Sequence, residues 1–529
     1  MVREAHGGTS PGPQDLTISQ SEYNPQPQDN TNVVASQGTN GDRVVLVMVG
    51  LPARGKTYIA RKVARYLTFF HGAPVRTFNV GEYRRKHGRL SEHGADYFSV
   101  DNERASEERE RFAHAAMTDM KAFLTKDKSL GRVAIFDGTN TNVARRAWIL
   151  DELKDVVASK HNIIFVESIC NDDDIINANI RATKLHSPDY QNCNADEAVA
   201  DFKRRIAHYE AVYEPLSDEG GPMSGRNASH DFTHRHLSWI KLIDCGRQVV
   251  VNRIKGFLQG RIIQFLMNVH TLPRTIYLSR HGQSEYNVLK KIGGNSSLSE
   301  RGNIYAQSLA LWVHKNVLKP ASEDDPTNSH SMYARLWTSS LNRTKLTGAY
   351  IKNEELEGTG WVTMRAREWR CLDEIYAGVF DGMSYEEIET RFPAEFALRA
   401  QDKLSYRYPR GESYLDVMQR LDPIVHELER QTDPLLIIGH QGILRVIYAY
   451  LTGAPREEAP NVPIPLHTVV KLTPQVYSCM EERFPLSSVS PSAEPMTANS
   501  EPEPQAEVAG IGDHKQDELG EDEKNAPSC

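Results

Sequence analysis

The sequence predicts a two-domain α/β protein whose first domain is built on a mostly parallel sheet. At 529 residues the chain is too long for a single hydrophobic core, so two or more domains are expected. In two separate regions, short apolar runs typical of strands alternate with charged stretches typical of helices. This alternation indicates parallel strands that are covered by helices on both faces.

Local pattern assigns the elements in each region. In the first region we expect a helix over Tyr58 to Leu67 and apolar strands over 44–49, 133–136 and 163–169. In the second region we expect strands over 275–279 and 435–438. Polar or irregular stretches are interpreted as surface loops at 218–236, 321–331 and 354–360.

Composition indicates the domain boundaries. Residues 1–41 are rich in Ser, Gly, Pro, Gln and Asn and are predicted to be disordered. The first domain is expected over 42–270 and the second over 271–480, with the junction near Asn268 to Pro273. Residues 481–529 are rich in Ser, Pro and Glu and are predicted to form a disordered acidic tail.

The net charge of −8 belongs to that tail, since residues 485–529 hold ten Asp or Glu and two Lys. The rest of the chain is balanced, so neither nucleic acid nor an acidic membrane is an expected partner. The six cysteines include no C-x-x-C pair, which argues against a zinc site and fits reduced thiols. No run reaches the length of a membrane span, and the N-terminus is too polar for a signal peptide. A soluble cytoplasmic protein is therefore expected.

The stretch GLPARGKT, from Gly50 to Thr57, fits the phosphate-loop pattern G-x-x-x-x-G-K-[ST]. It stands between an apolar strand and a helical segment, which is the context that the pattern requires. Backbone N–H groups and the helix N-terminus would surround an anion, with Lys56 on the outer phosphates and Thr57 on Mg²⁺. The alternative is an ordinary glycine turn. The strand and the helix favour nucleotide triphosphate binding.

Asp137 ends the apolar strand 133–136, where a carboxylate that holds Mg²⁺ would stand beside a phosphate loop. Taken alone, such an Asp is often a helix cap. Phosphoryl transfer also needs cations on the acceptor and on the transferred group. The cationic candidates are Arg84, Arg85, Arg109, Arg145, Lys184, and Arg204 or Arg205. Spacing alone does not choose among them, because a single Arg is usually part of a solvated helix face.

Two histidines follow strands in the second region. Arg280-His281-Gly282 follows the strand over 275–279, and His440 follows the strand over 435–438. Side chains at the carboxyl ends of two strands of one sheet can meet in one pocket. A neutral imidazole is a good nucleophile near pH 7, so a phosphohistidine is possible there. The alternative for any single histidine is a packed or surface residue.

Six motifs in the first region resemble 6-phosphofructo-2-kinase: GLPARGKTY, FNVGEYRR, FDGTNT, VESICND, KLHSPDY and RRIxxYE. With the second half, the chain resembles the bifunctional 6-phosphofructo-2-kinase/fructose-2,6-bisphosphatase family from about Arg43 to Pro474. The resemblance implies a P-loop kinase domain with the following roles. ATP would contact Gly50, Gly55, Lys56, Thr57, Tyr58 and Asn179, and Mg²⁺ would contact Thr57 and Asp137. Asp137 and Lys184 would be catalytic, and fructose 6-phosphate would contact Arg84, Arg109, Thr139, Arg145, Arg205 and Tyr209.

The RHG triplet in its strand context resembles the histidine phosphatase superfamily, whose fold is like that of phosphoglycerate mutase. The resemblance implies that His281 takes up the phosphoryl group and that Glu374 acts as general acid and base. Phosphate would be bound by Arg280, Arg343 and His440. The sugar bisphosphate would contact Asn287, Gly293, Tyr385, Arg399, Lys403, Tyr414, Gln441 and Arg445.

Four positions depart from the usual family pattern. Gly138 stands in place of Ala, Gln283 in place of Glu, and Lys291 in place of Arg. Asp373 stands in place of Asn, directly before Glu374. A second acid there would raise the pKa of Glu374 by like-charge repulsion, so the rate and pH optimum are more open to change than the reaction.

The expected protein is thus a bifunctional enzyme that uses ATP and Mg²⁺. It would make fructose 2,6-bisphosphate from fructose 6-phosphate and hydrolyse it through a phosphohistidine. By resemblance the product regulates glycolysis, and the chain forms a homodimer. Two alternatives stay open: a monofunctional member with one decayed domain, and a nucleotide-dependent scaffold that binds sugar phosphates without turnover.

Overall fold

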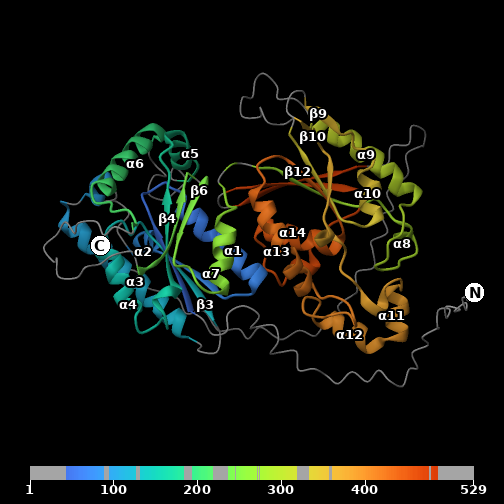
Figure 1. The fold of residues 1–529 in the computed structure, drawn as a ribbon, viewed down its shortest axis with the longest axis horizontal. Coiled ribbons are helices and arrows are strands. Elements are labelled where there is room, and N and C mark those ends of the chain that lie inside the picture. Colours follow the sequence, from blue (N-terminus) through green and yellow to red (C-terminus); the bar gives the residue numbers. More distant parts are fainter. Residues whose placement is uncertain are drawn as a thin grey trace, which may run out of the picture. The chain divides into compact units, whose positions relative to one another are not determined.

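The computed structural model describes most of the two predicted domains. The described residues are 43–87, 94–99, 101–126, 131–183, 194–217, 236–244, 246–270, 272, 274–318, 333–356, 360–475 and 478–486. They form two six-stranded sheets, each with its own helices (Figure 1). All of them belong to one compact unit, Met1–Ser488. None of the helices in these ranges is long and apolar enough to cross a membrane.

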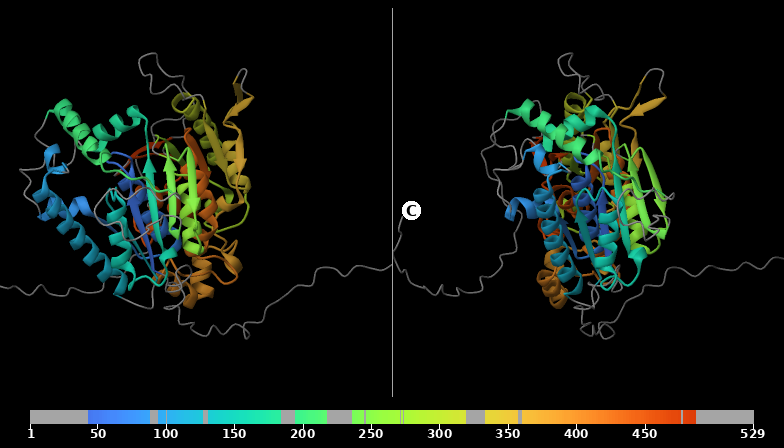
Figure 2. Two further views of the ribbon diagram at one scale, coloured as in Figure 1. Left: turned by 60° about the vertical axis from the view of Figure 1, so that its left-hand side comes forward. Right: turned by 90° about the vertical axis from the view of Figure 1, so that its left-hand side faces the viewer.

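The first sheet has the strand order β2-β3-β1-β4-β5-β6, and its strands run side by side in Figure 2. Five strands are parallel, and the edge strand β6 is antiparallel to β5. Strand β1 is buried on both faces, which explains its continuous apolar sequence. The strands are β1 (Arg43–Val49), β2 (Val75–Asn79), β3 (Arg132–Asp137), β4 (Ile163–Ile169), β5 (Ser238–Ile243) and β6 (Gln248–Asn252).

Helices cover both faces of this sheet. Helices α1 (Lys56–His71) and α7 (Phe257–Leu266) pack on one face, where their apolar side chains meet Val44, Leu46 and Met48 of β1. Helices α3 (Glu103–Thr125) and α4 (Val143–Leu153) pack on the other face. The remaining elements are α2 (Val80–His87), α5 (Asp173–Thr183), α6 (Ala195–Glu210), and the short 3-10 helices η3 (Ala95–Phe98) and η4 (Lys160–Asn162).

The second sheet has the order β11-β8-β12-β7-β13-β14. Strands β11, β8, β12 and β7 are parallel, and β13 and β14 extend the sheet by antiparallel pairing. The strands are β7 (Ile276–Arg280), β8 (Arg335–Thr338), β11 (Ala366–Glu368), β12 (Leu435–Gly439), β13 (Thr468–Pro474) and β14 (Cys479–Pro485). A separate pair is formed by β9 (Glu354–Leu356) and β10 (Trp361–Thr363).

Helices also lie on both faces of the second sheet. Helix α9 (Glu300–Asn316) packs on one face, and α13 (Tyr414–Arg430) and α14 (Gln441–Thr452) pack on the other. The other helices are α8 (Glu285–Val288), α10 (Asn342–Gly348), α11 (Tyr385–Arg391) and α12 (Pro393–Gln401). Short 3-10 helices are η7 (Arg370–Leu372), η8 (Gly378–Phe380) and η9 (Ala459–Asn461). The α/β class predicted for both regions is confirmed.

One predicted loop is wrong in part. The stretch 354–360 was expected to be irregular, but Glu354–Leu356 is strand β9 and pairs antiparallel with β10. A three-residue strand has no periodicity that a sequence could display, because its partner alone defines it. Strand β14 also continues to Pro485, beyond the expected boundary at residue 480. Of the predicted loop over 218–236, only His236 is described, and the predicted loop over 321–331 lies outside the described residues. The expected N-terminal tail also lies outside them, and of the expected C-terminal tail only residues 481–486, in and after β14, are described.

Helix α1 also contacts the second region. The Nζ of Lys62 on α1 lies 3.0 Å from each carboxylate oxygen of Glu429 on α13. The same carboxylate accepts hydrogen bonds from Arg274 Nη2 at 2.5 Å and from the Tyr450 hydroxyl at 2.6 Å. All four side chains are buried. Because α1 begins at the phosphate loop, one helix connects that loop to the core of the second region.

Candidate active sites

The predicted phosphate loop lies between β1 and α1. Gly50 has a φ of 130°, and a Cβ there would lie 2.5 Å from the carbonyl oxygen of Ser168, so only glycine fits. Gly55 is the N-cap of α1 with a φ of 77°. The first N–H groups of a helix have no partner within it, and together with the helix dipole they form an anion site. The Nζ of Lys56 contacts the Leu51 carbonyl at 2.5 Å across this loop.

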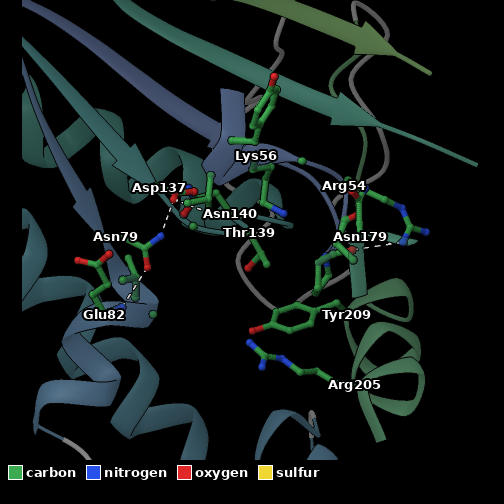
Figure 3. A pocket seen from close by; sticks show the side chains of 18 of the residues that line it. Arg54, Lys56, Asn79, Glu82, Asp137, Thr139, Asn140, Asn179, Arg205 and Tyr209 are labelled. Carbon is green, nitrogen blue, oxygen red and sulfur yellow. Dashed lines mark hydrogen bonds between the residues drawn. The ribbon is translucent and has the colours of Figure 1, made fainter. Parts of the chain in front are cut away.

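Asp137 stands at the end of β3, next to the phosphate loop. The hydroxyl of Thr57 donates to its Oδ2 at 2.8 Å, and the amide of Asn79 donates to the same oxygen at 2.5 Å. Asn79 is held in turn because its Oδ1 accepts the N–H of Glu82 at 3.0 Å (Figure 3). The aspartate is buried, with 2% of its surface exposed. The geometry therefore directs one carboxylate oxygen toward the phosphate loop and fixes it from two sides.

The sequence analysis did not single out Asn79, although it lies within the motif FNVGEYRR. It ends strand β2, and the β2–β3 register sets it directly beside Asp137. Strand β2 has only five residues with one fully buried side chain, so its apolar pattern is weak. A prediction of β2 would have revealed Asn79 as a second polar residue at the end of a strand.

A cavity of about 1020 Å³ opens in front of this loop. Its lining includes the described kinase residues expected to bind fructose 6-phosphate: Arg84, Arg109, Thr139, Arg145, Arg205 and Tyr209. Figure 3 shows Thr139, Arg205 and Tyr209 directed into the same space as Lys56. The cavity is also lined by Gly55, Lys56, Thr57, Tyr58 and Asn179, whereas Gly50 is not among its lining residues. Lys184 is outside the described residues.

The arginines of this cavity are held by their surroundings. The guanidinium carbon of Arg205 lies 3.6 Å from the ring centre of Phe98, and Arg145 pairs with Glu110 at 2.6 Å. Burial lowers the pKa of Arg145, and Glu110 opposes that effect. Arg109 donates to the carbonyl of Tyr97. Such fixed cations suit a phosphorylated acceptor, because they need little reorganisation when it binds.

The two predicted phosphatase histidines lie side by side. Strand β7 pairs with β12 so that Arg280 faces Gly439, and the next residue on each strand is a histidine. The N–H of His281 donates to the Gly439 carbonyl at 3.0 Å, and the ring centres of His281 and His440 are 5.2 Å apart. Both rings are buried. As predicted, two separate strands bring these histidines side by side.

The hydrogen bonds of His281 determine which of its nitrogens can react. Its Nδ1 lies 2.7 Å from the carbonyl oxygen of Gly282, which can only accept, so Nδ1 carries the proton. The lone pair is then on Nε2. Burial, with Arg343 and Arg280 nearby, lowers the pKa of His281 well below its ordinary value. A neutral ring with an unprotonated nitrogen is the form that attacks phosphorus.

Glu374 lies in a cavity of about 710 Å³ that Arg343 and Gly293 also line. Its Oε1 accepts the N–H groups of Ile375 at 3.0 Å and Gly442 at 3.1 Å. Asp373, the unusual neighbour, lines the same cavity, and its carboxylate accepts both the N–H and the hydroxyl of Ser340, at 2.7 to 2.8 Å. Asp373 thus attaches the Glu374 loop to the loop that precedes Arg343.

Several residues expected to hold the sugar bisphosphate form a cationic group. Arg399 donates to the hydroxyls of Tyr385 at 3.0 Å and Tyr408 at 2.7 Å. Arg445 lies 3.5 Å from the Tyr414 hydroxyl. Burial, together with Arg445 and Arg399, lowers the pKa of Lys403 to about 8. Arg399, Lys403 and Arg445 are thus three cations that repel one another, and such a group is suited to a polyanionic ligand.

The other predicted residues have more local roles. Asn287 caps α8, because its Oδ1 accepts the N–H of Ser284 at 2.9 Å. Gln441 is the first residue of α14, and Gly293 has a φ of 72°. Arg280 is buried and donates to the Ile464 carbonyl at 3.0 Å. Tyr408 was not predicted, and its surroundings in the sequence LSYRYPR carry no signal that would have identified it.

Comparison with known proteins identifies both regions. Residues 31–273 match the 6-phosphofructo-2-kinase family, and residues 276–484 match branch 1 of the histidine phosphatase superfamily. The chain is 44% identical over 449 residues to 6-phosphofructo-2-kinase/fructose-2,6-bisphosphatase 3 of Rattus norvegicus, covering 85% of this chain and 73% of that one. It is 43% identical over 438 residues to the Gallus gallus enzyme, covering 83% and 84%. For form 1 of Homo sapiens the identity is 42% over 451 residues, covering 85% and 86%.

Both catalytic regions are therefore present in one chain, the kinase region first. The first region is a kinase and accordingly uses ATP, and the second is a phosphatase. The chain belongs to the bifunctional 6-phosphofructo-2-kinase/fructose-2,6-bisphosphatase family.

Proposed function

We propose that the kinase site moves the γ-phosphoryl group of ATP to O2 of fructose 6-phosphate with Lys56, Thr57 and Asp137 at its centre. Lys56 neutralises the outer phosphates, which lie over the N-terminus of α1. The P–O bond to the β-phosphate breaks as the bond to O2 forms. The O2 proton leaves toward Asp137. The 2.8 Å contact between Thr57 and Asp137 supports this proposal, because it joins the loop to the strand-end carboxylate.

The same two side chains fit Mg²⁺. Both offer oxygen, the donor that this ion prefers, and Mg²⁺ in kinase sites is usually held by one or two protein oxygens plus phosphates and water. Within the described ranges no group of three or more His, Cys, Asp or Glu could hold a metal, which agrees with so sparse a site. Bound there, the ion would neutralise charge on the transferred group. Thr57 and Asp137 would orient it, and Asn79 would orient Asp137.

Fructose 6-phosphate occupies the far side of the same cavity in this proposal. Arg84, Arg109, Arg145 and Arg205 neutralise its phosphate, and Thr139 and Tyr209 orient the sugar. Asn179 lies toward the nucleotide, where its amide donates to the Ala53 carbonyl of the loop at 3.2 Å. Lys184 completes the charge balance on the moving group. The arrangement of cations around one cavity is the supporting observation.

In the phosphatase site, Nε2 of His281 attacks the phosphorus at position 2 of fructose 2,6-bisphosphate. The P–N bond forms as the P–O2 bond breaks, and Glu374 gives its proton to O2. Water then attacks the phosphorus of the phosphohistidine and Glu374 takes a proton from that water. The P–N bond breaks as the new P–O bond forms, which releases phosphate and restores His281. Arg280 and Arg343 hold the transferred phosphate, His440 holds Arg343 at its Nε, and Asn287 orders the adjacent turn. The hydrogen bond from His281 Nδ1 to Gly282 carries the proposal, because it leaves Nε2 unprotonated.

The rest of the sugar bisphosphate is held by Tyr385, Arg399, Lys403, Tyr414 and Arg445, with Gly293 and Gln441 at the edges. The cations of this group bind the 6-phosphate. We place the enzyme in the cytoplasm, where sugar phosphates and ATP are abundant. We also propose a homodimer, as the family resemblance suggests. In the described part of the chain, strand β6 lies at an edge of the first sheet and pairs with β5 on one side. Its other side is where a second copy of the chain would pair.

One experiment tests both sites. The full chain is incubated with [γ-³²P]ATP and fructose 6-phosphate, and labelled fructose 2,6-bisphosphate is measured. In parallel, the chain is mixed with 2-³²P-labelled fructose 2,6-bisphosphate and quenched rapidly. We expect label on the protein that is stable to base and labile to acid. Absence of product in the first reaction, or of protein-bound label in the second, would contradict the corresponding half of the proposal.

A further inference from the structure

The hydroxyl of Ser339 connects the ring of His440 to the loop that carries Arg343. Its Oγ lies 2.7 Å from Nε2 of His440. On the other side of the ring, Nε of Arg343 lies 3.2 Å from Nδ1. All three side chains are buried, and neither Ser339 nor His440 exposes any surface. Both ring nitrogens of His440 are therefore held by buried protein groups.

The direction of these hydrogen bonds follows from Arg343. A guanidinium N–H can only donate, so Nδ1 of His440 must be the acceptor. A neutral ring has one proton, which is then on Nε2, and Nε2 donates to Ser339 Oγ. An imidazolium, or the other tautomer, would set an N–H of the ring against the N–H of Arg343. Burial and the nearby Arg343 lower the pKa of His440 well below its ordinary value, in agreement with the neutral form.

The hydroxyl of Ser339 is fully used. Besides the ring, it accepts the N–H of Leu341 at 3.1 Å, so both of its lone pairs are occupied. Its own proton goes to Oγ1 of Thr344, 2.8 Å away. Thr344 passes its proton to the carbonyl of Leu341 at 2.8 Å. Every donor in this series of hydrogen bonds has an acceptor, and reversing the link between Ser339 and Thr344 would leave the Ser339 proton facing only donors.

This series of hydrogen bonds also determines how Arg343 is oriented. Its Nε is held by His440 and its Nη1 donates to the Gly294 carbonyl at 2.7 Å, so the plane of the guanidinium is fixed. Arg343 is one of the groups that lower the pKa of His281, which indicates that its charge lies close to the nucleophile. If Nδ1 of His440 carried the proton, Arg343 would lose its acceptor and turn away.

We propose that Ser339, supported by Thr344, is a positioning residue of the bisphosphatase: it holds His440 as the neutral Nε2–H tautomer, so that Nδ1 keeps Arg343 aimed at the phosphoryl group that passes to His281. Neither hydroxyl contacts the substrate. The inference rests on the proposed roles of Arg343 and His281. Accordingly, His440 serves here as a support for Arg343.

The test compares Ser339→Ala with three other variants of the full chain. Ser339→Ala leaves a buried N–H without an acceptor, so we expect the bisphosphatase kcat to fall about tenfold to a hundredfold. The KM should change less than about threefold, because other residues bind the sugar. Thr344→Val should reduce kcat in the same direction by a smaller factor, and Thr344→Ser, which keeps the hydroxyl, should restore it. Ser238→Ala is the matched control: this serine is equally buried but lies in the kinase sheet.

A second measurement reads the tautomer directly. The chain is labelled with [¹⁵N]histidine, and two-bond ¹H–¹⁵N correlations are recorded, with His440→Gln used to identify the signals of His440. In the unmodified chain we expect the proton on Nε2 and a bare Nδ1. In Ser339→Ala we expect this pattern to be lost or averaged with the other tautomer. If Ser339 had only a structural role, Ser339→Ala with intact kinase activity would show the same His440 tautomer as the unmodified chain.

Three outcomes would overturn the proposal: an unchanged kcat in folded Ser339→Ala, a proton on Nδ1 of His440 in the unmodified chain, or equal kcat values in Thr344→Val and Thr344→Ser. Kinase activity of each variant reports whether the chain is folded. If Ser339→Ala does not fold, the Thr344 pair decides. Failure of the unmodified chain to form labelled phosphohistidine would contradict the route through His281 instead, and the tautomer measurement would still test the chain of hydrogen bonds.

Discussion

The two active sites handle the same phosphoryl group in opposite surroundings. The kinase site is a cavity of about 1020 Å³ whose cations are aligned by rings, carboxylates and carbonyls around it. In the phosphatase region the cavity that holds Glu374 is smaller, about 710 Å³, and the protons of the two buried histidines are assigned by their neighbours. A kinase must admit two substrates at once and neutralise their charge. A phosphatase that forms a covalent intermediate must instead hold one nitrogen unprotonated.

The difference shows what each chemistry requires of the fold. In the kinase the decisive groups come from a loop and from a helix N-terminus, which are suited to phosphates. In the phosphatase they come from the ends of neighbouring strands, which hold two rings at a fixed spacing. The five predictions below test this contrast, in order of decreasing effect.

The largest effect is expected for His281→Ala. Without a nitrogen to accept phosphorus, the covalent intermediate cannot form, and the bisphosphatase rate should fall by about a thousandfold or more. The kinase rate should stay within a few-fold, and net fructose 2,6-bisphosphate should accumulate. The measurement is the trapping of base-stable ³²P on the protein. His440→Ala is the comparison, and it should carry less label or lose it slowly. Full labelling of His281→Ala would assign the nucleophile to another residue.

Lys56→Met should abolish most kinase turnover and spare the phosphatase. The lost charge is most valuable while the γ-phosphoryl group is in transit, so kcat should fall about a hundredfold to a thousandfold. Hydrolysis of fructose 2,6-bisphosphate, measured on the same preparation, serves as the control for folding. Normal kinase turnover in this variant would remove the loop lysine from the mechanism. A parallel loss of both activities in folded protein would mean that the two sites act as one.

Glu429→Gln tests the contact between α1 and the second region. Burial alone would raise the pKa of Glu429, but Arg274 and Lys62 overcome this and lower it. The variant leaves Lys62 and Arg274 buried without a counter-charge, so the free energy of unfolding should fall by ~3–5 kcal/mol. Both activities should disappear together at a lower temperature. Glu482→Gln, in an exposed pair with Lys471, is the control and should change stability by less than ~1 kcal/mol.

The same carboxylate gives a pH dependence with a definite sign. Its pKa is lower in the folded chain than in the unfolded one, so its contribution to stability is present above the unfolded value of about 4.5 and is lost below it. Acid unfolding measured by circular dichroism should therefore begin at a higher pH than expected from the exposed carboxylates alone. In Glu429→Gln this part of the acid transition should be missing.

The smallest effect concerns Lys403, whose pKa is lowered to about 8. It is charged below that pH and neutral above it, so fructose 2,6-bisphosphate should bind several-fold more weakly at pH 9 than at pH 7. Lys403→Met should bind weakly at both values, with a flatter profile. The measurement is the KM of the bisphosphatase across this range, with kinase KM values as the control. An identical pH profile in variant and unmodified chain would exclude Lys403 from phosphate binding.

The sequence by itself determined the parts of the protein whose structure depends on residues that are close together along the chain. The phosphate loop is a run of eight residues whose glycines and lysine act together, so it can be recognised without a fold. The strands that end at Asp137 and at Gly439, directly before His440, were predictable because continuous apolar runs mark buried parallel strands. The resemblance then assigned the remaining site residues, and several of them line a cavity, such as Arg205 in the first region and Glu374 in the second.

The tertiary structure decided what depends on residues that are distant in sequence. Asn79 reaches Asp137 through the pairing of β2 with β3, and Ser339 reaches His440 across 101 positions of the chain. The buried Glu429 finds its lysine on a helix 367 positions earlier. A serine, an asparagine or a glutamate carries no local mark of such a partner. Hydrogen bonds in a protein interior are set by which strands pair and which helices pack, and composition and periodicity do not encode that choice.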